Sequence, residues 1–328
     1  MKLKNIFLAL SLSSSLAFSA DLTITSFPLA SVMFKEYNQM FKKHWFKKTN
    51  QEINLELIGE TFNITNAKVQ RGTLDSNIVS LANSSDIEGL VKAGLVETNW
   101  KEKLPNQTQP YYSTVAFLVR KGNPKGIKDW NDLVRPKVSY IFANPANNHN
   151  PRFAILSALM YAQEKYKTEA EVENFMREFA LHLATVGDKG AKATQKFLTN
   201  PSIDALLIYE SEVINLKEKH SQEEFEVVIP SISVLAEFST VMVDKLTQDK
   251  TKQNLAEEYL KYLYTEEAQE FIASKYHYRV PNSQVMLKYQ DKFPAIKLRN
   301  INELGDYPSI EKTFFSKNGK WNKWLDGE

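Results

Sequence analysis

The 328-residue sequence contains no cysteine and only five histidines. The absence of cysteine excludes disulfide bonds, thiolate nucleophiles and cysteine-ligated zinc or iron–sulfur sites. The sequence also lacks nucleophile-elbow, zincin, phosphate-loop and dinucleotide-binding motifs. We therefore expect a protein that is not an enzyme and that needs no cofactor. The formal net charge of only +2 argues against strong attraction to nucleic acid or to an anionic membrane.

After residue 20 the sequence has no run of about 18 apolar residues, the length that a membrane-spanning helix requires. The first 19 residues differ from the rest, because Lys2 and Lys4 precede an apolar and serine-rich stretch that ends in Ala17-Phe18-Ser19. We expect a signal peptide at 1–19, cleaved after Ser19 or alternatively after Ala20, and export to the periplasm. Loss of the two lysines takes the net charge from +2 to 0. An N-terminal core helix is the competing interpretation.

Periodic apolar patterns predict alternating strands and helices. Residues 21–27 and 52–60 alternate apolar and polar side chains as half-buried strands do, and residues 32–46 repeat apolar side chains at helical spacing after Ser31, a predicted N-cap. Further strands are predicted at 112–124, 138–145, 203–213 and 225–230, further helices at 152–166 and 254–276, and a strand followed by a helix at 77–96. This order predicts an α/β layered fold.

One polar loop follows a predicted strand directly. Residues 144–153 read NPANNHNPRF, with four asparagines, a histidine and an arginine. In open α/β sheets, ligands gather where strands end and helices begin, and a helix starting near Pro151 directs free backbone N–H groups toward this loop. Asparagine both donates and accepts hydrogen bonds. A ligand-binding loop and a plain surface loop both remain open at this point.

Three long blocks carry a family resemblance. They are YYSTVAFLVRKGNPKGIKDWNDLVRP (111–136), FEVVIPSISVLAEFSTVMVD (225–244) and AEEYLKYLYTEEAQEFIASKYHYRVPN (256–282). In this order they resemble the periplasmic sulfate/thiosulfate-binding protein family, the solute-binding component of an ABC importer.

The resemblance implies a two-lobed periplasmic binding protein fold of type II, with crossing hinge segments. Lobe 1 is expected to comprise residues 20–112 and 239–328, including the C-terminal helices, and lobe 2 residues 113–238. The lobes would close on a small-molecule ligand, an anion or an oxygen-rich organic compound. The protein, expected as a monomer, would then dock onto the permease and ATPase of the importer.

Carried over position by position, the resemblance also implies ligand-binding residues, although several differ from the family pattern. The family's S-Y-D-P is Ser26-Phe27-Pro28-Leu29 here, its glycine-rich S-H-G-G-S-G-K is residues 58–64, and its donor tryptophan is Tyr209. Its P-N-P-K-S-S-G-G-A-R becomes residues 143–152. The residues expected to contact ligand are Ser26, Phe27, Thr61, Phe62, Asn63, Asn148, His149, Asn150, Arg152, Gly190, Ala191 and Tyr209.

These substitutions predict a diverged ligand site. Phe62 near an anion would exclude it by bulk, and Glu60 would exclude it by charge, so we expect a ligand other than simple free sulfate. Arg152 could pair with the ligand or form a salt bridge beside its own helix. His149 has no partner histidine nearby in the sequence, so no metal site is expected. An exported adhesin or signalling module that kept the fold is the alternative function.

Overall fold

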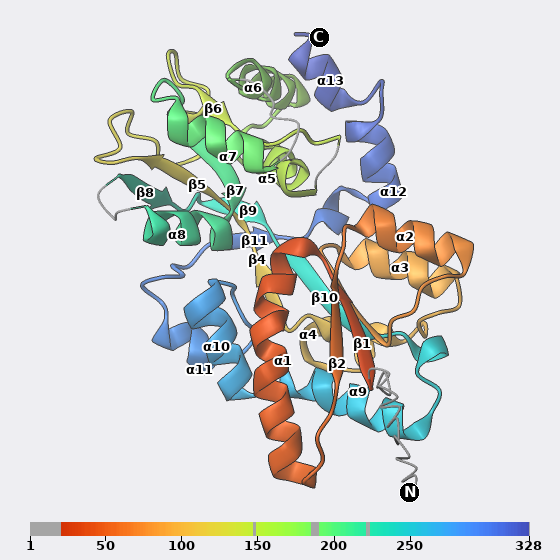
Figure 1. The fold of residues 1–328 in the computed structure, drawn as a ribbon. Coiled ribbons are helices and arrows are strands. Elements are labelled where there is room, and N and C mark those ends of the chain that lie inside the picture. The colour runs from red at the N-terminus through yellow and green to blue at the C-terminus, as the bar shows by residue number, and fades with distance from the viewer. Residues whose placement is uncertain (1–20, 147–148, 185–189, 221–223, 328) are drawn as a thin grey trace, which may run out of the picture.

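The computed structural model describes residues 21–146, 149–184, 190–220 and 224–327, which form two lobes (Figure 1). Lobe 1 contains a five-stranded sheet in the order β2-β1-β3-β10-β4, and lobe 2 a four-stranded sheet in the order β6-β7-β5-β8. A short sheet pairs β11 with β9. The strands are β1 (Leu22–Ser26), β2 (Leu55–Gly59), β3 (Ile78–Leu81), β4 (Tyr111–Ser113), β5 (Val115–Arg120), β6 (Tyr140–Ile141), β7 (Ala205–Tyr209), β8 (Phe225–Val228), β9 (Ile232–Val234), β10 (Ala236–Met242) and β11 (Lys297–Arg299).

Helices surround both sheets, which confirms the predicted α/β fold class (Figure 1). In lobe 1 they are α1 (Pro28–Thr49), α2 (Phe62–Arg71), α3 (Ser84–Lys92), the short α4 (Pro105–Thr108), α9 (Lys250–Tyr262), α10 (Glu266–Tyr276) and α11 (Ser283–Lys288). In lobe 2 they are α5 (His149–Lys165), α6 (Glu169–Leu181), α7 (Gly190–Thr199) and α8 (Glu210–Lys219). The C-terminal α12 (Tyr307–Ile310) and α13 (Lys320–Leu325) follow. Among the described residues no helix is both long and apolar enough to cross a bilayer.

Several predicted boundaries were wrong. Helix α1 begins at Pro28, whose fixed φ suits the first helical turn, and Ser31 lies inside the helix with its hydroxyl donating to the Pro28 carbonyl. Helix α5 begins at His149 instead of near Pro151. The predicted strand at 203–213 ends at Tyr209, where α8 begins. The predicted helix at 254–276 divides, because the Thr265 side chain caps a second helix by accepting from the Ala268 N–H.

The predicted strand at 112–124 is also divided, and this division creates a crossing between the lobes. β4 belongs to the lobe 1 sheet and β5 to the lobe 2 sheet, with Thr114 between them. The Thr114 hydroxyl donates to the Val234 carbonyl at 2.9 Å, which fastens this crossing to the returning segment β9–β10. Helix α13 packs against α6 of lobe 2. The division at residues 112 and 239 stays a prediction.

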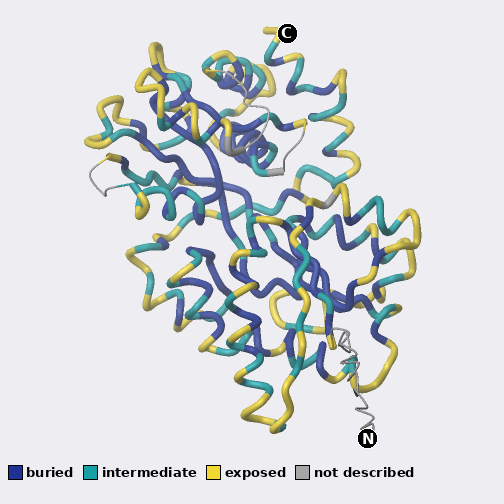
Figure 2. Tube along the Cα trace, viewed as in Figure 1, coloured by how far each residue is buried: buried dark blue, intermediate teal, exposed yellow. Residues whose placement is uncertain are grey.

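A continuous buried core runs through the crossing strands (Figure 2). Phe238 of β10 lies at its centre, because its ring contacts Phe27 of lobe 1 at a centroid distance of 5.1 Å and Tyr209 of lobe 2 at 5.5 Å. Tyr111 of β4 also lies 5.5 Å from Phe238. Aromatic contacts therefore link the two lobes where the strands cross between them, as the backbone does.

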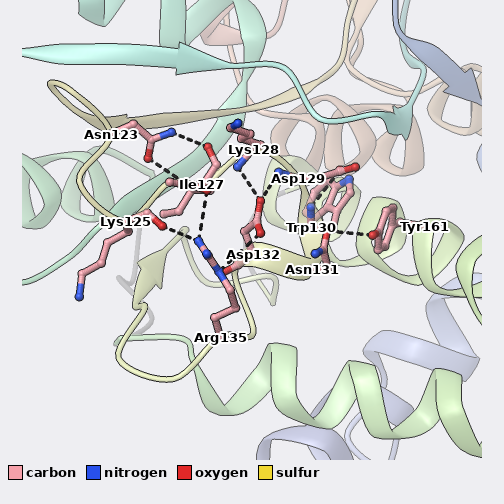
Figure 3. Close-up of polar contacts among 11 residues, drawn as sticks. Asn123, Lys125, Ile127, Lys128, Asp129, Trp130, Asn131, Asp132, Arg135 and Tyr161 are labelled. Carbon is pink, nitrogen blue, oxygen red and sulfur yellow. Dashed lines mark hydrogen bonds and ion pairs between the residues drawn. The ribbon is translucent and has the colours of Figure 1, made fainter.

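Residues 128–133, KDWNDL, form a tight hydrogen-bonded turn in lobe 2 (Figure 3). The Asp132 carboxylate accepts from the backbone N–H groups of Lys128 at 2.7 Å and Asp129 at 3.0 Å, and Asp129 caps the short helix Trp130–Asp132 in return. The Trp130 indole, which is fully buried, donates to the Ile232 carbonyl at 2.7 Å. This turn therefore positions a tryptophan in the core of lobe 2, next to the returning strand β9.

Candidate functional site

Buried polar atoms without hydrogen-bond partners concentrate where the two lobes meet. Among the described residues, eight buried side-chain atoms have no partner, and two of them, on Trp45 and Tyr264, lie elsewhere. The other six are Ser26 Oγ, Asn83 Nδ2, Ser85 Oγ, Asp86 Oδ2, Asn150 Oδ1 and Ser239 Oγ. Buried polar groups in proteins are nearly always paired, so a cluster of unpaired ones marks a place where a ligand or water supplies the missing partners.

Strand pairing explains why the lobe 1 members of this set share one sheet edge. Ser26 is the last residue of β1 and pairs in register with Ser80 of the parallel strand β3. Asn83 follows the end of β3, and Ser239 of β10 pairs with Leu81, the last residue of β3. The carboxyl ends of β1 and β3 therefore bring these side chains to the edge where open α/β sheets bind ligands.

The first turn of α3 contributes Asp86 to this edge. Asn83 is the N-cap: its Oδ1 accepts from the Ser85 N–H at 3.0 Å, which leaves Nδ2 unpaired. Asp86 is 4% exposed, and burial raises the pKa of its carboxyl well above the ordinary value, although the Arg152 charge in lobe 2 acts in the opposite direction. Asp86 and Arg152 thus interact electrostatically across the junction between the lobes.

Lobe 2 faces this edge with the first turn of α5. The Asn150 Nδ2 donates to Glu212 Oε2 of α8 at 2.9 Å, while its Oδ1 has no partner. Burial raises the pKa of Glu212 to about 7, and the hydrogen bond from Asn150 opposes that rise. The junction therefore contains two carboxyl groups, Asp86 and Glu212, whose ionisation the protein disfavours.

The Arg152 guanidinium is held by groups around its own helix. Its Nε donates to the Pro145 carbonyl at 2.6 Å, and its Nη1 donates to Tyr307 Oη at 3.1 Å and to Glu311 Oε2 at 2.5 Å. Of the two roles expected from the sequence, the structure thus contains the salt bridge. The C-terminal segment thereby fixes a positive charge near Asp86.

Tyr209 ends β7 and is 5% exposed. Burial raises the pKa of its phenol well above the ordinary value, with Glu212, Tyr307 and Asp86 acting in the same direction. These electrostatic neighbours place Tyr209 at the junction, whereas its role as a donor to ligand stays a prediction.

Residues 58–64 include Glu60, whose charge was expected to repel an anion. Thr61 and Asn63 are exposed at the start of α2. The buried Glu60 carboxylate is paired, because Lys68 Nζ lies 2.6 Å from Oε2 and the Thr65 hydroxyl donates to Oε1 at 3.0 Å. Neighbouring groups of lobe 1 therefore compensate the charge of Glu60.

The structure describes the remaining expected site residues only in part. Asn148 lies outside the described residues. Phe62, His149 and Gly190 are the first residues of α2, α5 and α7, and Ala191 follows Gly190; the side chains of Phe62, His149 and Ala191 lie outside the described structure. Phe27 contributes to the core through its contact with Phe238.

Sequence reasoning missed Asn83, Ser85, Asp86, Glu212 and Ser239. One signal was available for the first three, because the run Asn-Ser-Ser-Asp at 83–86 directly follows a predicted strand and has the composition of a helix N-terminus. No local pattern distinguishes Glu212 or Ser239 from other residues of their elements. Their place at the junction results from long-range pairing of strands and helices.

Comparison with known proteins agrees with this architecture. A family model described as bacterial extracellular solute-binding protein matches residues 33–279. The chain is 34% identical to the sulfate-binding protein of Salmonella typhimurium over 319 residues, 96% of each chain. It is 35% identical to the thiosulfate-binding protein of Escherichia coli over 310 residues, which cover 94% of this chain and 91% of that one.

A solved structure shows the same fold. The sulfate-binding protein SubI from Mycobacterium tuberculosis superposes with a TM-score of 0.71 at 24% identity, covering 90% of this chain and 99% of that one. The two-lobed periplasmic binding protein fold expected from the sequence is thereby confirmed. The relatives above and the family model confirm the family resemblance: the chain belongs to the sulfate/thiosulfate-binding family of bacterial extracellular solute-binding proteins.

Proposed function

We propose that this chain is an exported, periplasmic solute-binding protein that captures a small anion between its lobes and delivers it, as a monomer, to the permease and ATPase of an ABC importer. One observation carries the proposal: unpaired buried polar atoms from both lobes meet at the junction. The relatives named for sulfate and thiosulfate support an oxyanion as the ligand class.

The physical basis of binding is the replacement of the water that the anion loses. Each buried polar group left unpaired costs about 1–3 kcal/mol, so a ligand that pairs several of them recovers a large part of that free energy. Asn83 and Ser85 lie on lobe 1 and Asn150 on lobe 2. A ligand that contacts both sets favours the closed arrangement of the lobes, which is hinge closure driven by differential binding.

We expect the preferred ligand to differ from simple free sulfate. The donor set at residues 148–150 reads Asn-His-Asn where the family pattern has Ser-Gly-Gly, and Asp86 and Glu212 add two carboxyl groups at the junction. When either carboxyl group is ionised, its charge opposes binding of a compact dianion, whereas a larger or organic oxyanion spreads its charge.

A thermal-shift panel on the mature chain, stripped of bound ligand by partial unfolding and dialysis, tests the proposal. The panel comprises sulfate, thiosulfate, molybdate, phosphate and small carboxylated or sulfonated organic anions. A ligand at one hundred times its dissociation constant is expected to stabilise the protein by about 2.7 kcal/mol. If no anion shifts the melting temperature, the proposal fails and the adhesin or signalling function takes its place.

Ser85→Ala locates the binding site. The Ser85 hydroxyl has no partner in the ligand-free protein, so its removal is expected to leave the melting temperature without ligand nearly unchanged. The variant is expected to bind the anion about tenfold more weakly, because one hydrogen bond to a charged group is lost. Ser231→Ala, at an exposed serine, is the matched control and should retain full affinity. Equal affinity in both variants would remove Ser85 from the site.

A further inference from the structure

The contact between Asn150 and Glu212 lies at the junction and joins the first turns of α5 and α8. The Asn150 amide nitrogen donates to Glu212 Oε2 at 2.9 Å, and the amide oxygen of the same side chain is buried without a partner. Glu212 is partly exposed as a residue, whereas its carboxyl group is desolvated by burial. The pair thus combines a titratable group with a side chain that can present either a donor or an acceptor.

The charge of Glu212 decides which end of the amide is free. An ionised carboxylate only accepts hydrogen bonds, so it must face the Asn150 NH₂ group and leave the carbonyl oxygen unpaired. A protonated carboxyl donates instead, and its O–H can pair with the carbonyl oxygen after a half-turn of the amide. The NH₂ group is then free to donate. An amide turn of this kind needs little space, because the two ends of the amide have nearly the same shape.

We propose that anion binding takes up one proton on Glu212 and turns the Asn150 amide, so that its NH₂ group donates to the bound anion. The inference rests on the proposed function of the junction as an anion site. The proton comes from solvent and ends on the Glu212 carboxyl, whose O–H donates to Asn150 Oδ1; no other bond forms or breaks. The ligand class that follows is an oxyanion without a proton of its own, taken up together with one proton.

Electrostatics favours this coupling. An anion near an ionised Glu212 meets like charge and an unpaired carbonyl oxygen, and both raise its free energy. Protonation removes the charge and replaces the acceptor with a donor in one step. Burial already holds the pKa of Glu212 at about 7 in the ligand-free protein, so proton uptake near neutral pH is inexpensive.

Other charged or titratable groups surround α8 and must be considered. Near the start of α8 are Tyr209 on β7, Asp86 on α3, Arg152 on α5, Tyr307 on α12, Tyr278 and the Arg279–Glu210 pair. The neighbouring strands contribute Arg120 on β5 and Glu226 on β8. At the far end of α8, His277 and Lys292 lie against Glu218. Burial raises the pKa of both Tyr209 and Tyr278 well above the ordinary value, and burial lowers the pKa of His277 to about 4. Asp86 is the described carboxyl whose titration most needs to be separated from that of Glu212.

The direction of the pH dependence follows from linkage. If the bound state requires protonated Glu212, affinity is full below the ligand-free pKa of about 7 and falls as the pH rises through it. The dissociation constant is then expected to rise roughly tenfold between about pH 6 and about pH 8. Sulfate, thiosulfate and 2-hydroxyethanesulfonate stay fully ionised across this range, so their own titration does not contribute.

Isothermal titration calorimetry of the full mature chain with these three anions tests the coupling. Titrations near neutral pH in buffers of different ionisation enthalpy give the number of protons taken up per anion, and titrations from about pH 6 to about pH 8 give the affinity profile. Wild-type protein is expected to take up between about half a proton and one proton and to show the tenfold loss. This proton count requires no variant, so it decides the inference even if a substitution prevents folding.

Glu212→Gln assigns the proton. Its amide can donate to Asn150 Oδ1 as the protonated acid does, so the variant is expected to bind at alkaline pH as tightly as wild type does at acid pH, with no proton uptake. Glu224→Gln, at an exposed glutamate of the same lobe, should keep the wild-type profile.

Binding with a flat profile and no proton uptake overturns the inference and leaves the proposed function intact. Unchanged proton uptake in Glu212→Gln also overturns it. Absence of binding by every anion of the thermal-shift panel overturns both proposals.

Discussion

Replacement of Arg279 by alanine is expected to lower the free energy of unfolding by about 3–5 kcal/mol, the usual cost of leaving one member of a buried ion pair unpaired. The Glu210 carboxylate is fully buried, and Arg279 contacts both of its oxygens, with Nε 2.7 Å from Oε2 and Nη2 2.8 Å from Oε1. Arg279 Nη2 also donates to the Pro294 carbonyl at 2.8 Å. Alanine leaves a buried carboxylate without its counter-charge.

Urea unfolding at several pH values checks this result. Burial raises the pKa of Glu210 and the Arg279 guanidinium lowers it, so the pKa rises further in the variant. The stability deficit is therefore expected to be largest at alkaline pH and to shrink as the pH falls and Glu210 becomes neutral. The double variant Arg279→Met with Glu210→Leu, which removes both charges, should be more stable than Arg279→Ala. A deficit below about 1 kcal/mol, the value typical of exposed pairs, would mean that the pair does not act as a buried one.

This ion pair matters beyond stability because it lies at the crossing between the lobes. The Arg279 backbone forms a two-way bridge with Tyr112 of β4, at 2.9 and 3.0 Å, and the Glu210 N–H donates to the Thr114 carbonyl at 2.8 Å. The pair thus fastens the start of α8 to the first crossing segment and to the segment after α10. Under the proposed hinge closure, lobe 2 is expected to move relative to lobe 1 around this point.

The sequence predicted the fold well because the fold depends on local periodicity that survives in each element. Residues 21–27, 52–60 and 152–166 have the expected strand and helix patterns, and each corresponds to an observed element, β1, β2 and α5. Boundaries were harder. Pro28 starts α1 three residues before the predicted cap at Ser31, since the fixed φ of proline suits the first helical position. The strand pattern of the sequence continues past Tyr209 and gives no sign of a boundary, although β7 ends at Tyr209 and α8 begins at Glu210.

The site was predicted only in part, and the reason is physical. The resemblance pointed to Asn150 and Arg152, which do lie at the start of α5, but it could not give their partners. Glu212 and Glu311 lie 62 and 159 residues further along the chain from the groups they contact. Burial, which raises the pKa of Asp86, is a property of packing between lobes and has no signature in a short segment. A polar side chain becomes energetically costly only when the fold buries it away from water without a hydrogen-bond partner, and a short segment of sequence does not show where this happens.

Replacement of Trp130 by alanine is expected to cost about 3–5 kcal/mol of stability, the usual range for removing a large aromatic side chain from a core. The Trp130 side chain is fully buried, with Phe117 edge-on at 4.8 Å and Phe179 at 6.1 Å between ring centroids. Alanine leaves a cavity among these rings and also removes the donor to the Ile232 carbonyl. Thermal or urea unfolding of the ligand-free protein measures the loss.

Trp130→Phe separates packing from hydrogen bonding at this position. Phenylalanine keeps most of the aromatic contact but leaves the Ile232 carbonyl without its indole donor, so a loss of about 1–3 kcal/mol is expected, less than for alanine. Because Ile232 begins β9, which leads into the returning strand β10, the same loss should loosen the crossing on the lobe 2 side. Faster amide exchange in residues 232–236 of the phenylalanine variant would show this loosening. Equal stability of the phenylalanine variant and wild type would limit the role of Trp130 to filling space.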